Sequence, residues 1–136
     1  MAVPALALCV ALAGAGCNLL NQLGSSPSTP STTPTETTTG TLGINGSALV
    51  SFTVTQAGAV TVTLTSLAPT SVPVGLGLGT PNGTSSCNMS SSTSTAVAGS
   101  APQISVTENP GTYCVDVYDV GNLTAASTFT VAITHS

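Results

Sequence analysis

The sequence predicts an all-β protein, an antiparallel β-sandwich of about six to eight strands. Three observations support this fold class. Short runs after residue 42 alternate apolar with hydroxyl residues, which is the period-2 pattern of strands that bury one face. Turn-forming Pro, Gly and Asn residues separate these runs. Outside the N-terminal apolar segment, no window shows the helical period of apolar residues.

The strongest strand pattern lies in residues 110–121, which open on a Pro-Gly turn. Apolar and aromatic residues of one face alternate there with residues of the other: Tyr113, Val115 and Val117 with Cys114, Asp116 and Tyr118. We expect the first three to face the core of a central strand and the other three to lie on its outer face. Asp116 should then face solvent without a partner.

Five further runs alternate in the same way and predict strands. Residues 50–54 and 60–64 flank a turn and are expected to pair as a hairpin. Residues 84–100 are rich in Ser and Thr but weakly patterned, so we expect a loop there, with at most one short strand. The remaining runs are 72–78, 103–107 and 128–134.

The N-terminal residues 1–16 are predicted to be a signal peptide. Their apolar run is shorter than the roughly 20 residues that span a bilayer, and its length suits an export signal. The run ends in small residues followed by Cys17, and this arrangement resembles the bacterial lipobox. The resemblance implies that Cys17 is the first mature residue and carries the acyl anchor. The alternative is ordinary cleavage after Ala15, which leaves Cys17 unmodified.

The predicted domain organisation follows from composition. Residues 17–23 would be the lipid-anchored mature N-terminus, and residues 42–136 the β-sandwich domain. Between them, residues 24–41 are rich in Ser, Thr and Pro and have no apolar periodicity. Such a segment does not bury enough surface to fold alone, so we expect a disordered linker.

Two cysteines remain for the folded domain, since Cys9 leaves with the signal peptide and Cys17 is assigned to the lipid. Exported proteins meet an oxidising compartment, so Cys87 and Cys114 are predicted to form a disulfide. Closing a loop of ~27 residues should contribute roughly 3–4 kcal/mol in the chain-entropy treatment. A reduced pair is the alternative.

The charge composition excludes several functions. Lys and Arg are absent and the net charge is −4, whereas Ser and Thr number 18 and 24 of 136 residues. Nucleic-acid affinity depends mainly on cations that neutralise phosphates, so nucleic acid is not an expected partner. The same absence excludes polybasic contact with anionic lipid.

No residue set predicts catalysis, a metal site or a cofactor. The sole histidine, His135, is expected to be a free tail residue, and no Gly-x-Ser-x-Gly motif is present. Asp116 and Asp119 are three apart on an extended segment, so their side chains should point to opposite faces. Asp119 would instead sit in the turn before Gly121. The alternative is that Glu108 and Asp119 meet at one end of the sandwich and bind Ca²⁺ weakly.

Glycine alternates along the segment 75–79. No helix or Lys follows it, as a phosphate-binding loop would require. We therefore expect a flat glycine face that lets another backbone or a ligand approach closely.

The runs 50–64, 110–117 and 129–133 resemble the bacterial pre-peptidase C-terminal domain. The resemblance covers about residues 45–135 and implies a jelly-roll-like β-sandwich. It also implies an accessory module of secreted enzymes, some relatives of which bind collagen, polysaccharide or calcium. The acidic cluster of the calcium-binding relatives is missing here, where the linker holds only Glu36.

The expected function is that of a non-enzymatic, exported lipoprotein of a bacterial cell envelope, at the outer membrane or cell surface, or otherwise secreted. It would contact the membrane through the anchor on Cys17 and present an accessory, adhesive or structural module. The alternative is a glycan- or protein-binding subunit that assists a secreted hydrolase. A glycan or an envelope protein is the expected partner.

Overall fold

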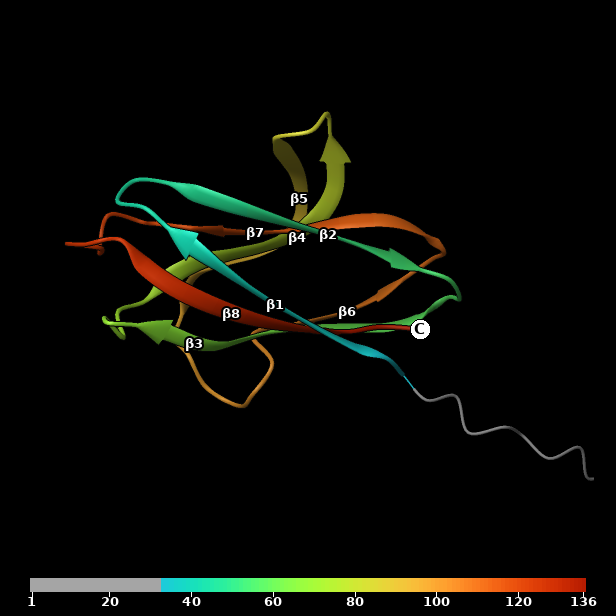
Figure 1. Cartoon of the computed structure of the whole chain (residues 1–136). Helices are drawn as coiled ribbons and strands as arrows, with labels where there is room; N and C mark the ends of the chain where they lie inside the picture. The colour runs from blue at the N-terminus through green and yellow to red at the C-terminus, as the bar shows by residue number, and fades with distance from the viewer. Residues whose placement is uncertain (1–32) are drawn as a thin grey trace, which may run out of the picture. The chain divides into compact units, whose positions relative to one another are not determined.

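A computed structural model describes residues 33–136, which form eight strands (Figure 1). In chain order the strands are β1 (Thr35–Leu42), β2 (Ser47–Val54), β3 (Gly58–Ala68), β4 (Val74–Asn82), β5 (Ser86–Ala96), β6 (Ile104–Glu108), β7 (Gly111–Tyr118) and β8 (Ser127–Thr134). Nothing in this part of the chain has the length and apolar character of a membrane-spanning helix. The predicted signal peptide, Cys17 and the segment 17–23 lie outside the described residues.

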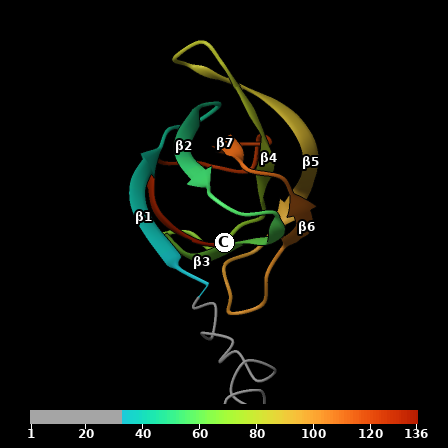
Figure 2. The same cartoon turned by 90° about the vertical axis from the view of Figure 1, so that its right-hand side faces the viewer.

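The strands form two four-stranded antiparallel sheets that face each other (Figures 1 and 2). Sheet A has the order β1-β8-β3-β6, and sheet B has the order β2-β7-β4-β5. Consecutive strands therefore change sheet at every connection except the β4–β5 hairpin. Eight strands wound in this way form a jelly roll. The predicted β-sandwich is confirmed, including its jelly-roll character.

The core lies between the two sheets. It is built from side chains that point inward at every second position of the strands. Both sheets contribute fully buried aliphatic side chains, together with Phe129; the largest are Leu42, Leu64, Leu76, Leu78 and Ile133. β7 is an inner strand of sheet B, and Tyr113, Val115 and Val117 face this core as predicted. The period-2 pattern thus identified the buried face correctly.

The predicted hairpin between residues 50–54 and 60–64 is wrong. β2 pairs with β7, from Ser47 opposite Tyr118 to Val54 opposite Gly111, whereas β3 pairs with β8 and β6. Alternation shows which face of a strand is buried but not which strand is its neighbour. Two consecutive strands in opposite sheets bury their apolar faces in the core between the sheets. Two strands of a hairpin bury theirs in the same core from one sheet, so the alternation pattern is the same in both cases.

The predicted linker 24–41 extends too far, because the strand β1 begins at Thr35. All eight residues of β1 pair with β8, and the Thr35 and Thr39 hydroxyls lie 3.0 and 3.1 Å from those of Thr134 and Thr130. A Thr-rich segment has no apolar period, but the open edge of β8 provides partners for its backbone groups. The folded domain therefore starts before residue 42.

The expected loop at 84–100 is mostly the strand β5, which has 11 residues and forms one edge of sheet B. Its side chains are largely exposed on both faces, so they show no alternation. Two register shifts against β4 each leave one extra residue in β5, and such bulges bend a strand. The tip of the β4–β5 hairpin projects from the sandwich (Figure 1).

Candidate functional site

The outer face of β7 brings together the residues that the sequence placed there. Cys114, Asp116 and Tyr118 follow one another at every second position on this face. Leu49 of β2 stands opposite Asp116 on one side, and Gly77 of β4 stands opposite it on the other. Residues directly opposite in a ladder share a face, so Leu49 neighbours the carboxylate.

Glycines make this face of β4 open enough for side chains from its neighbours to cross it. A Cβ at Gly75 would overlap with the Tyr118 ring, and a Cβ at Gly77 would overlap with the Met89 thioether. The close approach expected from the alternating glycines is thus made by side chains at Gly75 and Gly77 and by the Asn88 backbone at Gly79. Met89 of β5 consequently lies over Gly77, next to Asp116. We call Leu49, Met89, Cys114, Asp116 and Tyr118 the Asp116 patch.

The predicted disulfide between Cys87 and Cys114 is confirmed. Its two Cα atoms are 6.0 Å apart, although β4 lies between β5 and β7 in sheet B. β4 leaves the ladder with β7 at Gly79, opposite Cys114, and the hairpin tip beyond this point carries Cys87. The disulfide therefore ties the projecting hairpin to the inner strand and closes one side of the Asp116 patch.

Asp116 is a half-buried carboxylate without a hydrogen-bond partner. Its Oδ1 atom is buried, and no donor among the described residues reaches it. Its neighbours on this face, Leu49, Met89, Cys114 and Tyr118, are apolar or weakly polar. Desolvation by burial raises the pKa of Asp116 above its usual range.

Asp119 belongs to a different site, at the end of the sandwich that holds the β1–β2 and β7–β8 loops. Its Oδ2 accepts the N–H of Asn45 at 2.8 Å, and its Oδ1 accepts three N–H groups of its own loop, those of Gly121, Asn122 and Leu123, at 2.9–3.1 Å. These bonds, first that of Asn45, hold the pKa of Asp119 below its usual range. The expected turn before Gly121 is confirmed.

This loop end also exposes two aliphatic side chains. Ile44 is 52% exposed and Val120 is 39% exposed. Ile44 directly precedes Asn45 and Val120 directly follows Asp119, the two residues that hydrogen-bond to each other. The backbone N–H of Asp119 donates to the Gly46 carbonyl at 2.9 Å as well. The two loops are therefore fixed to each other by a carboxylate and by the main chain.

Glu108 and Asp119 do not meet at one end of the sandwich, so this expectation is wrong. Glu108 ends β6 just before β7 begins, whereas Asp119 follows the last residue of β7. The eight-residue strand β7 separates them. Within residues 33–136 no three metal-ligating side chains gather.

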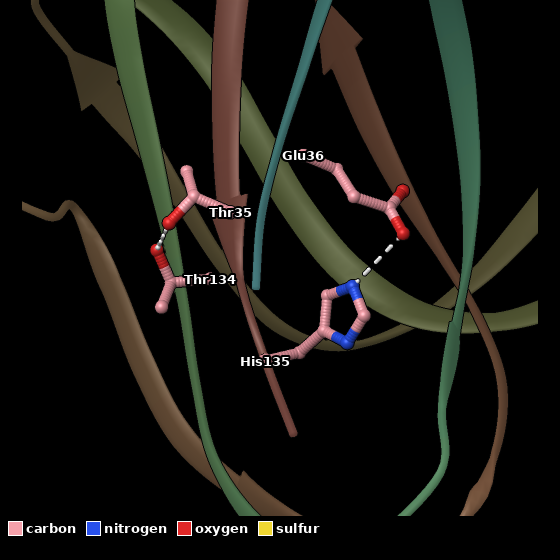
Figure 3. A network of polar contacts seen from close by, with 4 residues as sticks. All are labelled: Thr35, Glu36, Thr134 and His135. Carbon is pink, nitrogen blue, oxygen red and sulfur yellow. Dashed lines mark hydrogen bonds and ion pairs between the residues drawn. The ribbon is translucent and has the colours of Figure 1, made fainter. Parts of the chain in front are cut away.

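His135 is not the free tail residue that we expected. It is only 4% exposed, and its Nε2 lies 3.0 Å from Glu36 Oε1 (Figure 3). The centre of its ring lies 5.3 Å from that of Phe52. Its backbone N–H donates to the Pro34 carbonyl at 3.1 Å. Both ends of the domain lie at the same end of the sandwich (Figure 1). The contacts of His135 therefore hold the C-terminus against the start of β1.

Sequence reasoning missed three residues that define these sites. Met89 lay in a segment expected to be a loop, and Glu36 lay in the expected linker. Leu49 was detectable, since it precedes Val50 in the alternating run and therefore belongs on the outer face. No pocket is found among the described residues 33–136.

Comparison with known proteins supports the fold. No family model matches the sequence, and no curated protein sequence matches it. Among solved structures, the crystal structure of Yersinia pseudotuberculosis-derived mitogen matches with a TM-score of 0.53 at 14% identity. The match covers 76% of this chain and 87% of the mitogen chain. At this identity, the likeness concerns the β-sandwich architecture alone.

Proposed function

We propose that this chain is a non-enzymatic lipoprotein of a bacterial cell envelope, anchored through an acylated Cys17. It presents its jelly roll as an accessory, adhesive or structural module. The resemblance to the pre-peptidase C-terminal domain supports the accessory role. The signal-peptide and lipobox patterns of the sequence support export and anchoring.

The observation that best supports this proposal is the position of the two ends of the domain. β1 begins beside the C-terminus, at the end opposite the β1–β2 and β7–β8 loops (Figure 1). An anchor joined to the start of β1 would leave those loops, with the exposed Ile44 and Val120, facing away from the attachment point. Binding residues commonly lie on loops held by a rigid scaffold, as these are by Asp119.

Anchoring is tested by mass spectrometry of the mature N-terminus and by labelling cells with a fatty acid. We expect an acylated Cys17 and a membrane-bound protein, and we expect Cys17→Ser to release it from the membrane. An unmodified Cys17 in the membrane-derived protein would contradict the anchor. Ser25 is a suitable control position, because Ser25→Ala changes the segment after the cysteine without removing the thiol.

Surface display needs a reporter that does not use lysine, since the chain has none for amine-reactive reagents. An epitope inserted at Gly83–Ser85, in the exposed turn between β4 and β5, would serve. We expect antibody to bind intact cells. Binding only after cell lysis would place the module inside the envelope instead.

The second candidate function is a glycan- or protein-binding subunit that assists a secreted hydrolase. The observation that favours it is the Asp116 patch, an acid among aromatic and apolar side chains on a solvent-facing sheet. Pull-down with candidate hydrolases and a glycan array would test it. A hydrolytic activity of the chain itself, lost on changing one acid or His135, would contradict both proposals.

A further inference from the structure

Asp116 differs from the other three acids of the chain in the burial of an unpartnered carboxylate oxygen. Glu36 pairs with His135, and Asp119 accepts four backbone N–H groups. Glu108 is close enough to Tyr113 for its charge to raise the pKa of that phenol, after burial, while the phenol itself donates to the Asn109 carbonyl at 2.8 Å. Asp116 alone has a buried oxygen with no donor among residues 33–136.

The surroundings of Asp116 make a missing partner costly. One oxygen of the carboxylate is buried on a face whose neighbouring side chains are apolar or weakly polar, and an under-hydrated charge gains more from an ionic partner than an exposed one does. The chain has no Lys or Arg that could supply this partner, and a second copy of the chain has none either. A cationic complement would therefore be supplied by a different molecule.

We propose that the Asp116 patch binds a Lys or Arg side chain of another protein. This inference rests on the proposed role of the chain as a binding module and names the chemistry of its partner. The cation would pair with the Asp116 carboxylate, and the Tyr118 ring beside it offers a cation–π contact. Leu49 and Met89 would pack against the aliphatic part of the incoming side chain, because Lys and Arg carry apolar stems below their charged ends.

Charge favours this occupant over the others. A net charge of −4 without any cation repels phosphate- or carboxylate-bearing ligands. A neutral glycan offers hydroxyl donors to Asp116 but no positive charge, whereas Lys or Arg adds a Coulomb attraction that is stronger where the carboxylate is partly desolvated. A cationic side chain therefore satisfies the carboxylate better than a sugar hydroxyl does.

The test is an NMR titration of the exported, disulfide-bonded full chain with the peptide acetyl-Gly-Arg-Gly-amide at low salt. The same peptide with citrulline in place of Arg is the uncharged control. We expect the Arg peptide to shift the amide signals of Leu49, Asp116 and Tyr118 saturably. The citrulline peptide should bind at least about tenfold more weakly, because its uncharged urea group loses the ionic attraction to the carboxylate.

Two variants locate the binding. Asp116→Asn should weaken the association about tenfold, and its amide spectrum shows whether it remains folded. Glu108→Gln removes the same charge at the other end of β7 and should leave the association unchanged. Equal loss in both variants would show non-specific attraction to an acidic protein and would overturn the proposal.

The remaining outcomes are also decisive. Equal binding of the citrulline peptide would overturn the proposal, as would a neutral oligosaccharide that binds the patch and displaces the Arg peptide. The titration does not depend on acylation of Cys17. An unmodified Cys17 with intact peptide binding would therefore refute only the anchor, and an acylated Cys17 without peptide binding would refute only the patch.

Discussion

The Asp119 carboxylate accepts the backbone N–H of Asn45 at 2.8 Å and joins two loops that are 74 residues apart in sequence. Together with three N–H groups of its own loop, this bond stabilises the ionised carboxylate. The pKa of Asp119 is lowered in the folded state, so its contribution to stability is present above the unfolded value of about 3.9 and is lost as the pH falls through the folded value.

Asp119→Asn should therefore lower the free energy of unfolding at pH 7, and the difference from the unchanged protein should shrink as the pH falls below about 4. Urea unfolding at a series of pH values measures this. A difference that stays the same at pH 7 and pH 2 would contradict the role assigned to the carboxylate.

Asp116→Asn should have the opposite effect to Asp119→Asn and raise the free energy of unfolding at pH 7. Desolvation raises the pKa of Asp116 in the folded state, so the charged form destabilises the protein above the folded value, and the effect disappears as the pH falls through the unfolded value. We expect the variant to be more stable at pH 7 by at most about 1 kcal/mol, because the side chain is only half-buried and solvent screens it. The same urea series measures both variants, and a less stable Asp116→Asn protein at pH 7 would contradict the desolvation.

Removing the disulfide should destabilise the domain strongly. The bridge closes a loop with a separation of 27 residues. Replacing Cys87 and Cys114 with Ala should then lower the free energy of unfolding by about 3.5 kcal/mol, mainly because the unfolded chain gains freedom. Reduction of the unchanged protein with dithiothreitol is the control and should lower the urea midpoint similarly. An unchanged midpoint would mean that the bridge contributes nothing.

His135→Ala should cost about 2–3 kcal/mol, although the residue is next to the C-terminus. It removes a buried ring that packs on Phe52 and leaves the half-exposed Glu36 in contact with water. Glu36→Gln is the matched control and should cost less than about 1 kcal/mol, because an amide still bonds to the imidazole. Thermal unfolding measures this. If His135→Ala melts at the same temperature as the unchanged protein, the His135 side chain does not contribute to stability and behaves as a free tail residue.

Gly75→Ala should destabilise the protein by about 1–3 kcal/mol, because the new methyl group overlaps with the Tyr118 ring. Gly43→Ala is the control, since a Cβ there meets open space. Shortening Tyr118 to Ala in the Gly75→Ala background should remove most of the penalty. Independent, additive effects in this double-mutant cycle would show that the two residues do not touch.

Local patterns in the sequence were enough to predict the fold class, the buried face of β7 and the disulfide. The period of two in Tyr113, Val115 and Val117 is a property of neighbouring residues, and it marks the buried face wherever the strand pairs. The Cys87–Cys114 pair was predicted by elimination, because Cys9 lies in the predicted signal peptide and Cys17 is the predicted lipidation site.

Strand partners and the two acid sites emerged only from the tertiary structure. β2 and β3 have good alternating patterns, yet they belong to different sheets, because alternation is the same for any partner. β1 forms a strand because it pairs with the edge of β8. This pairing places Glu36 of β1 next to His135, whose imidazole contacts the Glu36 carboxylate. The Asp116 patch likewise depends on Met89, which lies over Gly77, the residue opposite Asp116, because β5 pairs with β4 and Gly77 has no side chain. Contacts between distant residues set these features, and no local pattern encodes them.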